Sequence, residues 1–548
     1  MSMRAAATLV ALSYAAQALG LHFPTSSKGS STHRLPWQQT PCQRLPHTRL
    51  CASEEVDWRE MRARLVAQEK ASSAQLPDAP APSPASGWVY ESPLIEQGTI
   101  LLGGTKMDFG FALRQQFFHK SVMLLLQHDA TFTKGIILNR PSALEVDGWR
   151  VWCGHGQVAE GGIFVGAERA KGELEISALH TLEGALADRV STRVIKGVSY
   201  TGLDGAKALV AAGVAQKSDF WVCVGYSGWA PGQLQMEVEQ RDSWYLASAD
   251  SGTLLKELLR EARGLPPPGD TAISADPGID TWSNLMKGIG READAAQSKG
   301  SLADRMLEQW VRAHLLPKPI LPTPPMPPSK KIKVGTVLLT SASKDTGLPA
   351  DRFLLHEQFL LKAVLLVLSE DPIGHQLTAC ILNRPTANVA RFNLPGDPTR
   401  RVAFCGDRAL GGQLWLHHRP ELGGVAVGDS RVFSLPVDTA SELLKTGRAA
   451  PDDFIFVGAA VQFGRDELEG MLAAGEVRCV APGKQLSTVW PRAWSLTKDN
   501  GGGEVGDGTE VWWLASQCGA EEQLAAVTSS DLADEALEEW LKFYVRSG

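Results

Sequence analysis

The stretch 133–141 reads Thr-Lys-Gly-Ile-Ile-Leu-Asn-Arg-Pro, and the stretch 377–385 reads Leu-Thr-Ala-Cys-Ile-Leu-Asn-Arg-Pro. Each is a short apolar run with β propensity that Asn-Arg-Pro closes. Proline lacks the N–H donor of a sheet ladder and favours extended geometry in the residue before it. Each stretch therefore predicts a strand that runs into a turn, and their recurrence predicts that the chain is a duplication.

The repeat continues on both sides of these two stretches, with offsets that drift as loop insertions would make them drift. The matched segments, first copy before second, are 98–102 and 335–339, 116–117 and 358–359, 122–126 and 364–368, 151–154 and 403–406, 161–162 and 411–412, 206–213 and 440–447, 220–225 and 454–458, and 302–310 and 532–540. The apolar runs predict buried strand residues at Leu124, Leu126, Ile136, Leu138, Leu366, Leu368, Ile381 and Leu382.

Composition divides the chain between and around the copies. The segment 317–329 is proline-dense and predicts a stiff spacer, because such a run cannot join a sheet. Val56, Met61 and Leu65 recur at helical spacing among charged residues, which predicts a short amphipathic helix. The loops 264–280 and 499–508 are rich in glycine and predict exposed segments. The predicted units are a targeting presequence at 1–53, the helix and an Ala/Pro/Ser linker at 54–87, a first domain at 88–316, the proline-rich linker at 317–329, and a divergent second domain at 330–548.

The first 53 residues contain five bases and no acid, with an apolar run near the start and a Ser/Thr-rich stretch after it. This order is typical of a signal peptide followed by a transit peptide. It predicts import into a plastid (chloroplast), with secretion or mitochondrial targeting as the alternatives.

The rest of the chain is acidic and globular in composition. Of the 548 residues, 44% are hydrophobic and 21% charged, and no segment has the continuous apolar length of a membrane helix. Without the presequence, 61 acids face 49 bases, a formal charge of −12. A net negative charge argues against non-specific nucleic-acid binding, which requires a basic surface. We therefore expect a soluble mature protein without nucleic acid as a partner.

Short strands interleaved with a few helices, without regular βαβ alternation, predict an α+β fold with mixed or antiparallel sheets. Four sets of residues then carry a family resemblance. They are the Gly-Thr-Ile-Leu-Leu run at 98–102, the Ser-Val-Met-Leu-Leu-Leu run at 121–126 with the phenylalanine before it, the Gly-Ile-Ile-Leu-Asn-Arg-Pro run at 135–141, and Gly-Tyr-Ser-Gly-Trp-Ala-Pro-Gly-Gln-Leu at 225–234. Together they resemble the YqgE/AlgH family of bacteria and plastids, in the first copy over most of its length and in the second more weakly. The resemblance implies two tandem domains of coiled sheets with packed helices, and it implies no established enzymatic activity.

The two copies depart from the family at different places. The second copy replaces the Gly-Trp loop with Val-Gln-Phe-Gly-Arg-Asp-Glu-Leu at 461–468. Leu416-His417 keeps a family-like Leu-His pair, which the first copy replaces with Val165-Gly166. Only the first copy is therefore expected to use the Gly-Trp loop in the manner of the family.

Asn-Arg-Pro is the strongest candidate for a role common to both copies. Asparagine tolerates turn geometry, and arginine presents five N–H donors in a planar fork, so the pair could hold a small anionic ligand at the end of a strand. In the alternative, these side chains fix the turn and tie it to a neighbouring acid. The candidate residues are Asn139, Arg140, Pro141, Asn383, Arg384 and Pro385.

The loop at 229–233 offers a second candidate binding site. Trp229, Pro231 and Gln233 could form an aromatic surface for a protein partner, because exposed tryptophan is typical of such surfaces. Packing of Trp229 in the core is the alternative.

Three further residues could be reactive. Ser227 follows a strand within Gly-Tyr-Ser-Gly, which is close to a nucleophile elbow but has Trp229 at the final glycine position. Cys153 and His155 could act as thiolate and base, although catalytic Cys/His pairs usually meet across space. A structural turn at Ser227 and a buried thiol at Cys153 are the alternatives.

No other motif of established mechanism is present. The sequence has no His-Glu-x-x-His, no Cys-x-x-Cys pair, and no phosphate-binding glycine loop after a predicted strand. We therefore expect no metal or cofactor, and we predict a non-catalytic binding or regulatory protein. The alternatives are a hydrolase or thiol enzyme that uses Ser227 or Cys153, and a transcriptional regulator, which the acidic charge disfavours.

Overall fold

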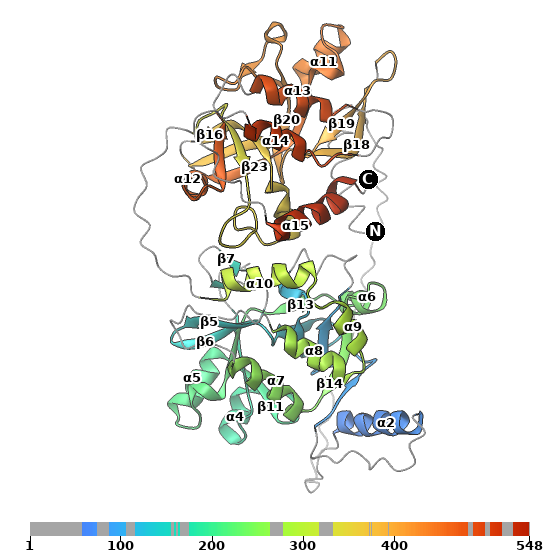
Figure 1. The fold of residues 1–548 in the computed structure, drawn as a ribbon. Helices are drawn as coiled ribbons and strands as arrows, with labels where there is room; N and C mark the ends of the chain where they lie inside the picture. The colour runs from blue at the N-terminus through green and yellow to red at the C-terminus, as the bar shows by residue number, and fades with distance from the viewer. Residues whose placement is uncertain are drawn as a thin grey trace, which may run out of the picture.

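The computed structural model describes residues 57–73, 87–105, 116–154, 158–159, 163–164, 175–263, 278–316, 332–371, 373, 375–392, 394–480, 486–498, 505–517 and 530–546 (Figure 1). The expected presequence, the proline-rich linker and His155 lie outside these ranges, as do most of the loops 264–280 and 499–508. We refer to 57–316 as the first half and to 332–546 as the second half.

The first half contains two six-stranded sheets. One has the order β1-β14-β2-β3-β4-β13, and the other has the order β10-β11-β9-β12-β6-β5. The pairs are antiparallel except for β12 and β6, which run parallel. The strands are β1 (Val89–Glu91), β2 (Ile100–Gly103), β3 (Val122–His128), β4 (Thr133–Ile137), β5 (Pro141–Val146), β6 (Trp149–Cys153), β7 (Val158–Ala159), β8 (Ile163–Phe164), β9 (Ile176–His180), β10 (Thr192–Ile195), β11 (Val198–Gly202), β12 (Trp221–Val224), β13 (Ser227–Trp229) and β14 (Trp244–Ala249).

The second half has an eight-stranded sheet of order β21-β22-β20-β23-β17-β16-β15-β24 and a separate β18-β19 pair. Its strands are β15 (Val337–Thr340), β16 (Val364–Asp371), β17 (Gln376–Ile381), β18 (Pro385–Arg391), β19 (Thr399–Ala403), β20 (Arg408–His417), β21 (Val425–Ala426), β22 (Phe433–Pro436), β23 (Ile455–Gly464) and β24 (Val477–Val480). The long strand β23 pairs with both β17 and β20 in a single sheet. In the first half the corresponding strands, β12 and β13, belong to two separate sheets. The mixed sheets agree with the predicted α+β class.

Helices surround the sheets of each half (Figure 1). In the first half they are α2 (Trp58–Ser73), η3 (Gln116–Phe118), α4 (Ala185–Val190), α5 (Leu203–Ala211), η5 (Lys217–Asp219), α6 (Gln233–Glu239), α7 (Ser251–Arg263), α8 (Ile279–Gly288), α9 (Glu292–Gln297) and α10 (Leu302–His314). In the second half they are η6 (Leu355–Leu360), η7 (Pro420–Leu422), α11 (Val437–Lys445), η8 (Pro451–Asp453), α12 (Arg465–Ala474), α13 (Leu486–Leu496), α14 (Thr509–Gln517), α15 (Asp531–Leu541) and the π-helical turn η9 (Lys542–Arg546). Within the described ranges, no helix combines the length and the apolar character needed to cross a lipid bilayer.

The expected strand-to-turn unit forms at both Asn-Arg-Pro stretches. β4 ends at Ile137 and β17 ends at Ile381, and each chain turns through Asn-Arg before proline begins the next strand. Seven of the eight predicted core residues are buried, but Leu368 is only partly buried. A β-bulge in β16 lies between Val367 and Ser369, but β3 has the same bulge at the matched Leu126, which is buried, so the bulge alone does not expose Leu368.

Glycine ends the two matched helices as predicted. Gly213 after α5 and Gly447 after α11 have φ of +72° and +68°. The residue after each glycine donates its N–H to a carbonyl of the last helical turn. Val214 N donates to Leu209 O at 3.1 Å, and Arg448 N donates to the matched Leu443 O at 3.0 Å. This left-handed closure is the one that glycine permits at least cost.

The helix α2 forms where it was expected, but its large apolar side chains do not face the protein. Trp58, Met61 and Leu65 are exposed. The helix docks through the opposite face, where Arg59 donates to Gly98 O at 3.0 Å and Arg62 pairs with Glu96. Ion pairs and carbonyl contacts therefore replace the apolar contacts that the spacing predicted.

Candidate functional site

The Asn139 side chain closes the first turn from inside the core. Its Oδ1 accepts from Val122 N at 2.7 Å, and its Nδ2 donates to Lys120 O at 2.9 Å and to Gly278 O at 2.7 Å. One buried amide therefore joins β3, the turn before β3 and the beginning of α8. All of these partners are backbone atoms, so the side chain is committed to holding segments that are far apart in the sequence.

Asn383 makes the same three bonds in the second half. Its Oδ1 accepts from Val364 N at 2.8 Å, and its Nδ2 donates to Lys362 O and to Gly508 O, both at 2.9 Å. We call each such set of bonds, with its glycine, an asparagine clamp. The clamp gives the asparagine of each turn a structural role, in place of the ligand-binding role that the sequence also allowed.

The arginines of the two turns are fully buried and also bond to the backbone. Arg140 donates from one amino group to Asn139 O at 2.9 Å and from the other to His119 O. Arg384 donates to Asn383 O at 3.1 Å and to Leu361 O. This is the arrangement of the turn-fixing alternative, in which backbone carbonyls accept hydrogen bonds from both arginines.

The buried position of Arg384 has an electrostatic consequence. Removal from water lowers the pKa of its guanidinium to about 10. A ligand could reach either arginine only if the turn opened, because neither side chain has exposed surface. Pro141 and Pro385 begin β5 and β18 beside these turns, paired with Trp152 and Ala403.

The ends of the two glycine-rich loops are buried, which corrects the expectation that these loops are exposed throughout. Gly278 and Gly508 have φ of +76° and +71° and lie against the clamps. A Cβ at Gly278 would stand 2.1 Å from Asn139 O, and one at Gly508 would stand 1.8 Å from Asn383 O. Sequence composition missed this because the contact joins residues more than 120 positions apart.

Trp229 lies in the core, which is the alternative that the sequence left open. Its side chain is 4% exposed, and its indole N–H donates to the Glu237 carboxylate at 3.0 Å. The indole N–H of Trp244 donates to the same oxygen at 3.0 Å, and Gln233 donates to the other oxygen at 3.1 Å. Gln233 is exposed, so it is the member of this loop that a partner could touch.

Glu237 is the residue of this loop that sequence reasoning missed. A glutamate on a short helix ordinarily lies on the solvated face, yet this carboxylate is buried and accepts three N–H donors. The available signal was the spacing of Gln233 and Glu237, four residues apart on α6. Glu237 therefore fixes the Gly-Trp loop to the core.

The candidate nucleophiles are buried within strands. Ser227 pairs with Gly135 across β13 and β4, and its hydroxyl has no hydrogen-bond partner within the described part of the chain. Cys153 ends β6 in the apolar core. Its counterpart Cys405 is also buried, and burial raises the pKa of that thiol to about 12. The pairing of Cys153 with His155 stays a prediction, because His155 lies outside the described residues.

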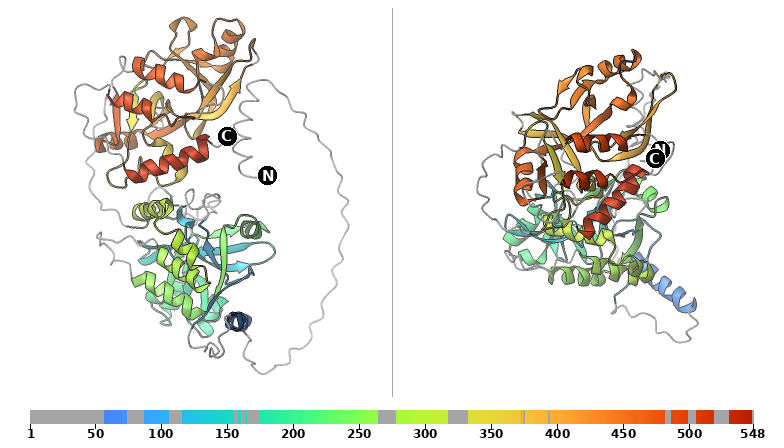
Figure 2. Two further views of the ribbon diagram at one scale, coloured as in Figure 1. Left: turned by 45° about the vertical axis from the view of Figure 1, so that its right-hand side comes forward. Right: turned by 45° about the horizontal axis from the view of Figure 1, so that its top comes forward.

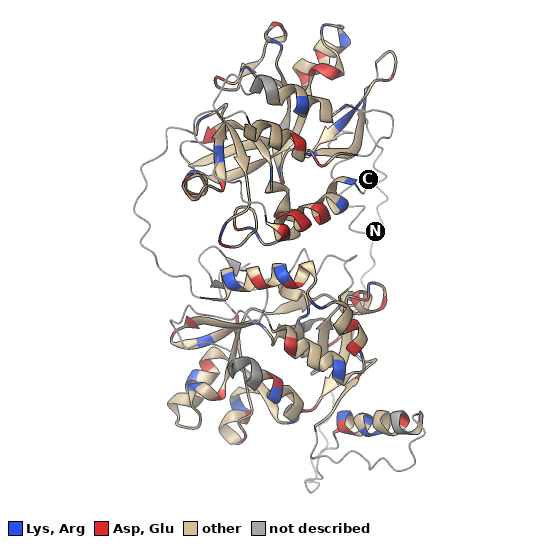
Figure 3. Cartoon of the chain, viewed as in Figure 1, with Lys and Arg blue, Asp and Glu red and all other residues tan. Residues whose placement is uncertain are grey.

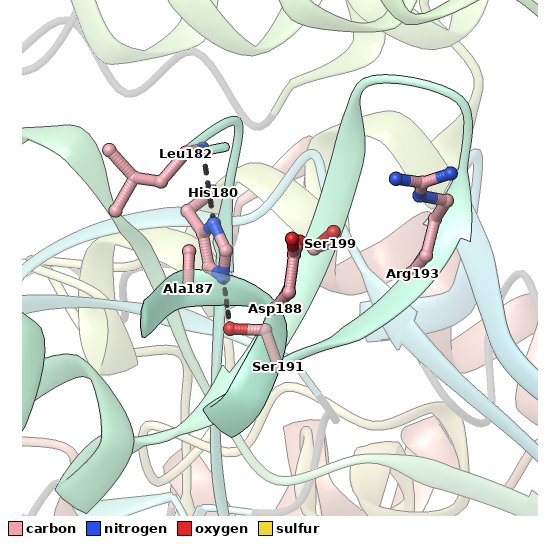
Figure 4. A pocket seen from close by; sticks show the side chains of 7 residues that line it. All are labelled: His180, Leu182, Ala187, Asp188, Ser191, Arg193 and Ser199. Carbon is pink, nitrogen blue, oxygen red and sulfur yellow. Dashed lines mark hydrogen bonds between the residues drawn. The ribbon is translucent and has the colours of Figure 1, made fainter. Parts of the chain in front are cut away.

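A pocket of about 310 Å³ opens in the first half between the end of β9, the helix α4 and the β10–β11 hairpin (Figure 4). Its lining residues are His180, Leu182, Ala187, Asp188, Ser191, Arg193 and Ser199. Hydroxyl groups and both signs of charge therefore reach one small cavity.

His180 is the fixed group of this pocket (Figure 4). Its Nδ1 lies 3.2 Å from Leu182 N, which can only donate, so Nδ1 accepts and the proton of the neutral ring is on Nε2. Nε2 lies 2.8 Å from Ser191 Oγ and therefore donates to it. In this tautomer the ring cannot take the Ser191 proton as a general base, so the Ser191 hydroxyl hydrogen is available to a ligand instead.

The second half contains the same histidine, which corrects the expected loss of the Leu-His pair from the first copy. Leu179 pairs with Trp221 as Leu416 pairs with Ile455, so Leu179-His180 is the counterpart of Leu416-His417. Val165-Gly166 is not that counterpart. The Nδ1 of His417 accepts from Arg419 N at 3.2 Å, and the Nδ1 of His180 accepts in the same way from Leu182 N. In both cases the donor lies two residues after the histidine.

Burial lowers the pKa of both imidazoles below the ordinary value of about 6.5. The unfolded chain takes up these protons near pH 6.5, whereas the folded chain does so only at lower pH. Their contribution to stability is therefore complete above pH 6.5 and declines as the pH falls toward the folded pKa, by up to about 1.4 kcal/mol per pH unit for each ring.

We expect the protein with His180→Gln and His417→Gln to lose less stability between pH 7 and pH 5 than the parent. Urea denaturation at the two pH values measures this difference. Equal losses in parent and double variant would contradict the assignment.

Among the residues that the structure describes, no group of three or more His, Cys, Asp or Glu residues is placed to hold a metal ion. The His180 pocket is lined by hydroxyl groups, a carboxylate and a guanidinium group.

Comparison with known proteins connects this architecture to one family. A family model described as AlgH-like (DUF179) matches residues 110–263. The UPF0301 protein of Streptomyces avermitilis is 32% identical over 166 residues, which cover 28% of this chain and 82% of that protein. The UPF0301 protein of Streptomyces coelicolor is 31% identical over 169 residues, covering 28% and 82%.

A solution structure of the AlgH protein from Pseudomonas aeruginosa is 18% identical, with a TM-score of 0.23, and covers 32% of this chain and 89% of that one. The two streptomycete proteins are matched over most of their own length. Residues 110–263, which the family model matches, hold the Gly-Trp loop and the His180 pocket. The chain belongs to the AlgH-like (UPF0301) family.

Proposed function

We propose that the chain is a non-catalytic binding or regulatory protein built from two AlgH-like domains, of which residues 330–548 form the second. The recurrence of whole contact sets supports the tandem. Besides the asparagine clamps, the indole N–H of Trp282 donates to Gly103 O at 3.0 Å and that of Trp512 donates to Thr340 O at 2.9 Å. Such agreement at equivalent positions is what duplication of one fold would leave.

Binding rather than catalysis is favoured by where the chemically capable groups lie. Ser227 is buried in a strand, and the thiol of Cys153 is buried in the core. The histidine that does reach a cavity is held in the tautomer that donates to serine. This last observation carries the proposal, because a Ser-His pair in that tautomer lacks the base that nucleophilic catalysis needs.

The pocket suggests what its ligand offers. Since His180 donates to Ser191, the serine hydroxyl donates outward, so the ligand presents an acceptor there. Asp188 lines the same cavity and is exposed, so the ligand also presents a donor. We therefore propose that the ligand is a small polar molecule that carries both a hydrogen-bond acceptor and a donor. We also propose that the second domain, which has Gly423 and Gly424 in the loop after His417, has a different partner.

A ligand-observed NMR screen of small polar metabolites against the full chain tests this proposal. Ser191→Ala should weaken the binding of any hit by roughly tenfold, which corresponds to a lost hydrogen bond of about 1.4 kcal/mol. Ser495→Ala, which removes an exposed hydroxyl on α13 in the second half, is the matched control and should leave binding unchanged. Hits that bind both variants equally, or the absence of hits, would count against the pocket.

The plastid location also remains our proposal, supported by the acid-free, basic and hydroxyl-rich composition of 1–53. A fusion of these residues to a fluorescent reporter should enter the plastid. Reporter that stays in the cytosol would refute plastid import, and reporter in the medium would favour secretion.

A further inference from the structure

We infer that α10 and α15 form an internal pseudo-twofold interface, and that Arg305 and Glu535 make each half of the chain pair with the other half rather than with a second copy of itself. This inference rests on the proposed tandem of two AlgH-like domains. It concerns a surface far from the His180 pocket, since α4 and α10 lie at opposite ends of the first half (Figure 1).

The two helices are equivalent elements of the repeat. Asp304 of α10 pairs with Lys120 at 2.8 Å, and Asp534 of α15 pairs with Lys362 at 2.8 Å. Both lysines have φ of +49°, and each lies two residues before a strand, Lys120 before β3 and Lys362 before β16. Each helix is thus attached to its own half by the same lysine-aspartate bond.

The apolar faces of the helices are also anchored alike. Trp310 packs on Phe117 with ring centroids 6.0 Å apart, and Trp540 packs on Phe359 at 5.9 Å. Because both helices sit on their own halves in the same way, each presents the equivalent outer face to the other half. Figures 1 and 2 show α10 and α15 facing each other in different views.

The contact between the helices has the signature of a twofold axis. A residue that lies on such an axis meets its own counterpart. Arg305 follows Asp304, and Glu535 follows Asp534, so the two are counterparts, and they form an ion pair across the interface. A second contact away from this axis joins His314 to Phe353, with ring centroids 5.3 Å apart.

The charges on the two helices then decide which pairing is allowed. α15 carries the acids Asp531, Asp534, Glu535, Glu538 and Glu539 and no base within Asp531–Leu541, while α10 carries arginines among its acids (Figure 3). In a symmetric pair of two first halves, Arg305 would meet Arg305. In a pair of two second halves, Glu535 would meet Glu535.

Only the pairing of a first half with a second half places opposite charges on the axis. The ion pair is partly exposed, so it adds little affinity by itself. The apolar core that extends from α10 into the second half supplies the attraction. The Arg305–Glu535 pair determines which halves associate, because a pair of identical halves would bring two like charges into close contact.

The test uses the full chain with a specific protease site inserted within 317–329. After cleavage, gel filtration and native mass spectrometry should show one first half bound to one second half, with no pair of identical halves. Separation of the parental halves at micromolar concentration, or the appearance of identical pairs, would overturn the inference.

Charge reversal tests the role of the two axis residues. Arg305→Glu and Glu535→Arg should each speed dissociation of the cleaved halves on the order of tenfold, and the double reversal should return it to within about threefold of the parent. Lys445→Glu, on α11 beside Glu442 of the same helix and at the end of the second half that is far from α10 (Figure 1), is the control and should change it little. A double variant that dissociates as fast as the singles would refute the assignment, and ligand binding at the His180 pocket, measured on the same proteins, reports separately on the proposed function.

Discussion

Gly508→Ala is expected to destabilise the second half by roughly 3 to 5 kcal/mol, because two costs add. The residue has φ of +71°, which an L-residue adopts at a cost of about 1 to 2 kcal/mol. An added Cβ would also stand 1.8 Å from Asn383 O, a backbone atom that cannot turn aside. Either the loop end or the Asn-Arg-Pro turn has to move, and the asparagine clamp opens. Urea denaturation of the purified variant measures the loss.

Gly447→Ala separates these two costs. Gly447 also has a positive φ, +68°, but a Cβ there meets nothing within 4 Å. Its replacement should therefore cost only about 1 to 2 kcal/mol, the conformational part alone. If Gly508→Ala and Gly447→Ala lost equal stability, the close approach to Asn383 would have no energetic weight. The matched pair Gly278→Ala and Gly213→Ala should repeat the difference in the first half.

Asn139→Ala and Asn383→Ala should each cost about 3 to 6 kcal/mol. Each removes an amide that satisfies one buried N–H and two buried carbonyls, and a buried polar group left without a partner costs about 1 to 3 kcal/mol. The two variants should lose similar amounts, because the distances in the two clamps agree within 0.2 Å.

Asn388→Ala is the control for asparagine replacement, since Asn388 is exposed on β18. It should change the free energy of unfolding by less than about 0.5 kcal/mol. A large loss at one clamp and none at the other would mean that the two turns are held differently. It would then weaken the case for a tandem.

The sequence predicted the parts of this fold that depend on local pattern. Ile-Leu-Asn-Arg-Pro combines strand propensity with a proline stop, so the strand and the turn at 133–141 followed from the residues alone. Glycine after α5 and α11 likewise marked helix ends. The choice between turn-fixing and ligand-binding asparagine needed the structure, because the partners Lys120 O and Gly278 O come from distant segments.

The parts that were missed depend on register and burial. The counterpart of Leu416-His417 was placed at Val165-Gly166 instead of Leu179-His180, because an insertion between β6 and β9 shifts the first copy, and only strand pairing restores the match. Glu237 was overlooked because a glutamate on a helix ordinarily faces water. The partial exposure of Leu368 was not predicted, because its counterpart Leu126 lies in the same kind of apolar run beside the same β-bulge and is buried.

The most direct test of the central claim, that this is a binding protein without a catalytic nucleophile, is the reactivity of Cys153 and Ser227 in the native full-length chain. The protein would be treated with iodoacetamide and with a fluorophosphonate, before and after unfolding in urea, and modified peptides identified by mass spectrometry. Both residues are buried in strands, so the account predicts no modification of either in the native chain and alkylation of Cys153 only after unfolding. Rapid native alkylation of Cys153, or stoichiometric native phosphonylation that Ser227→Ala abolishes, would contradict it.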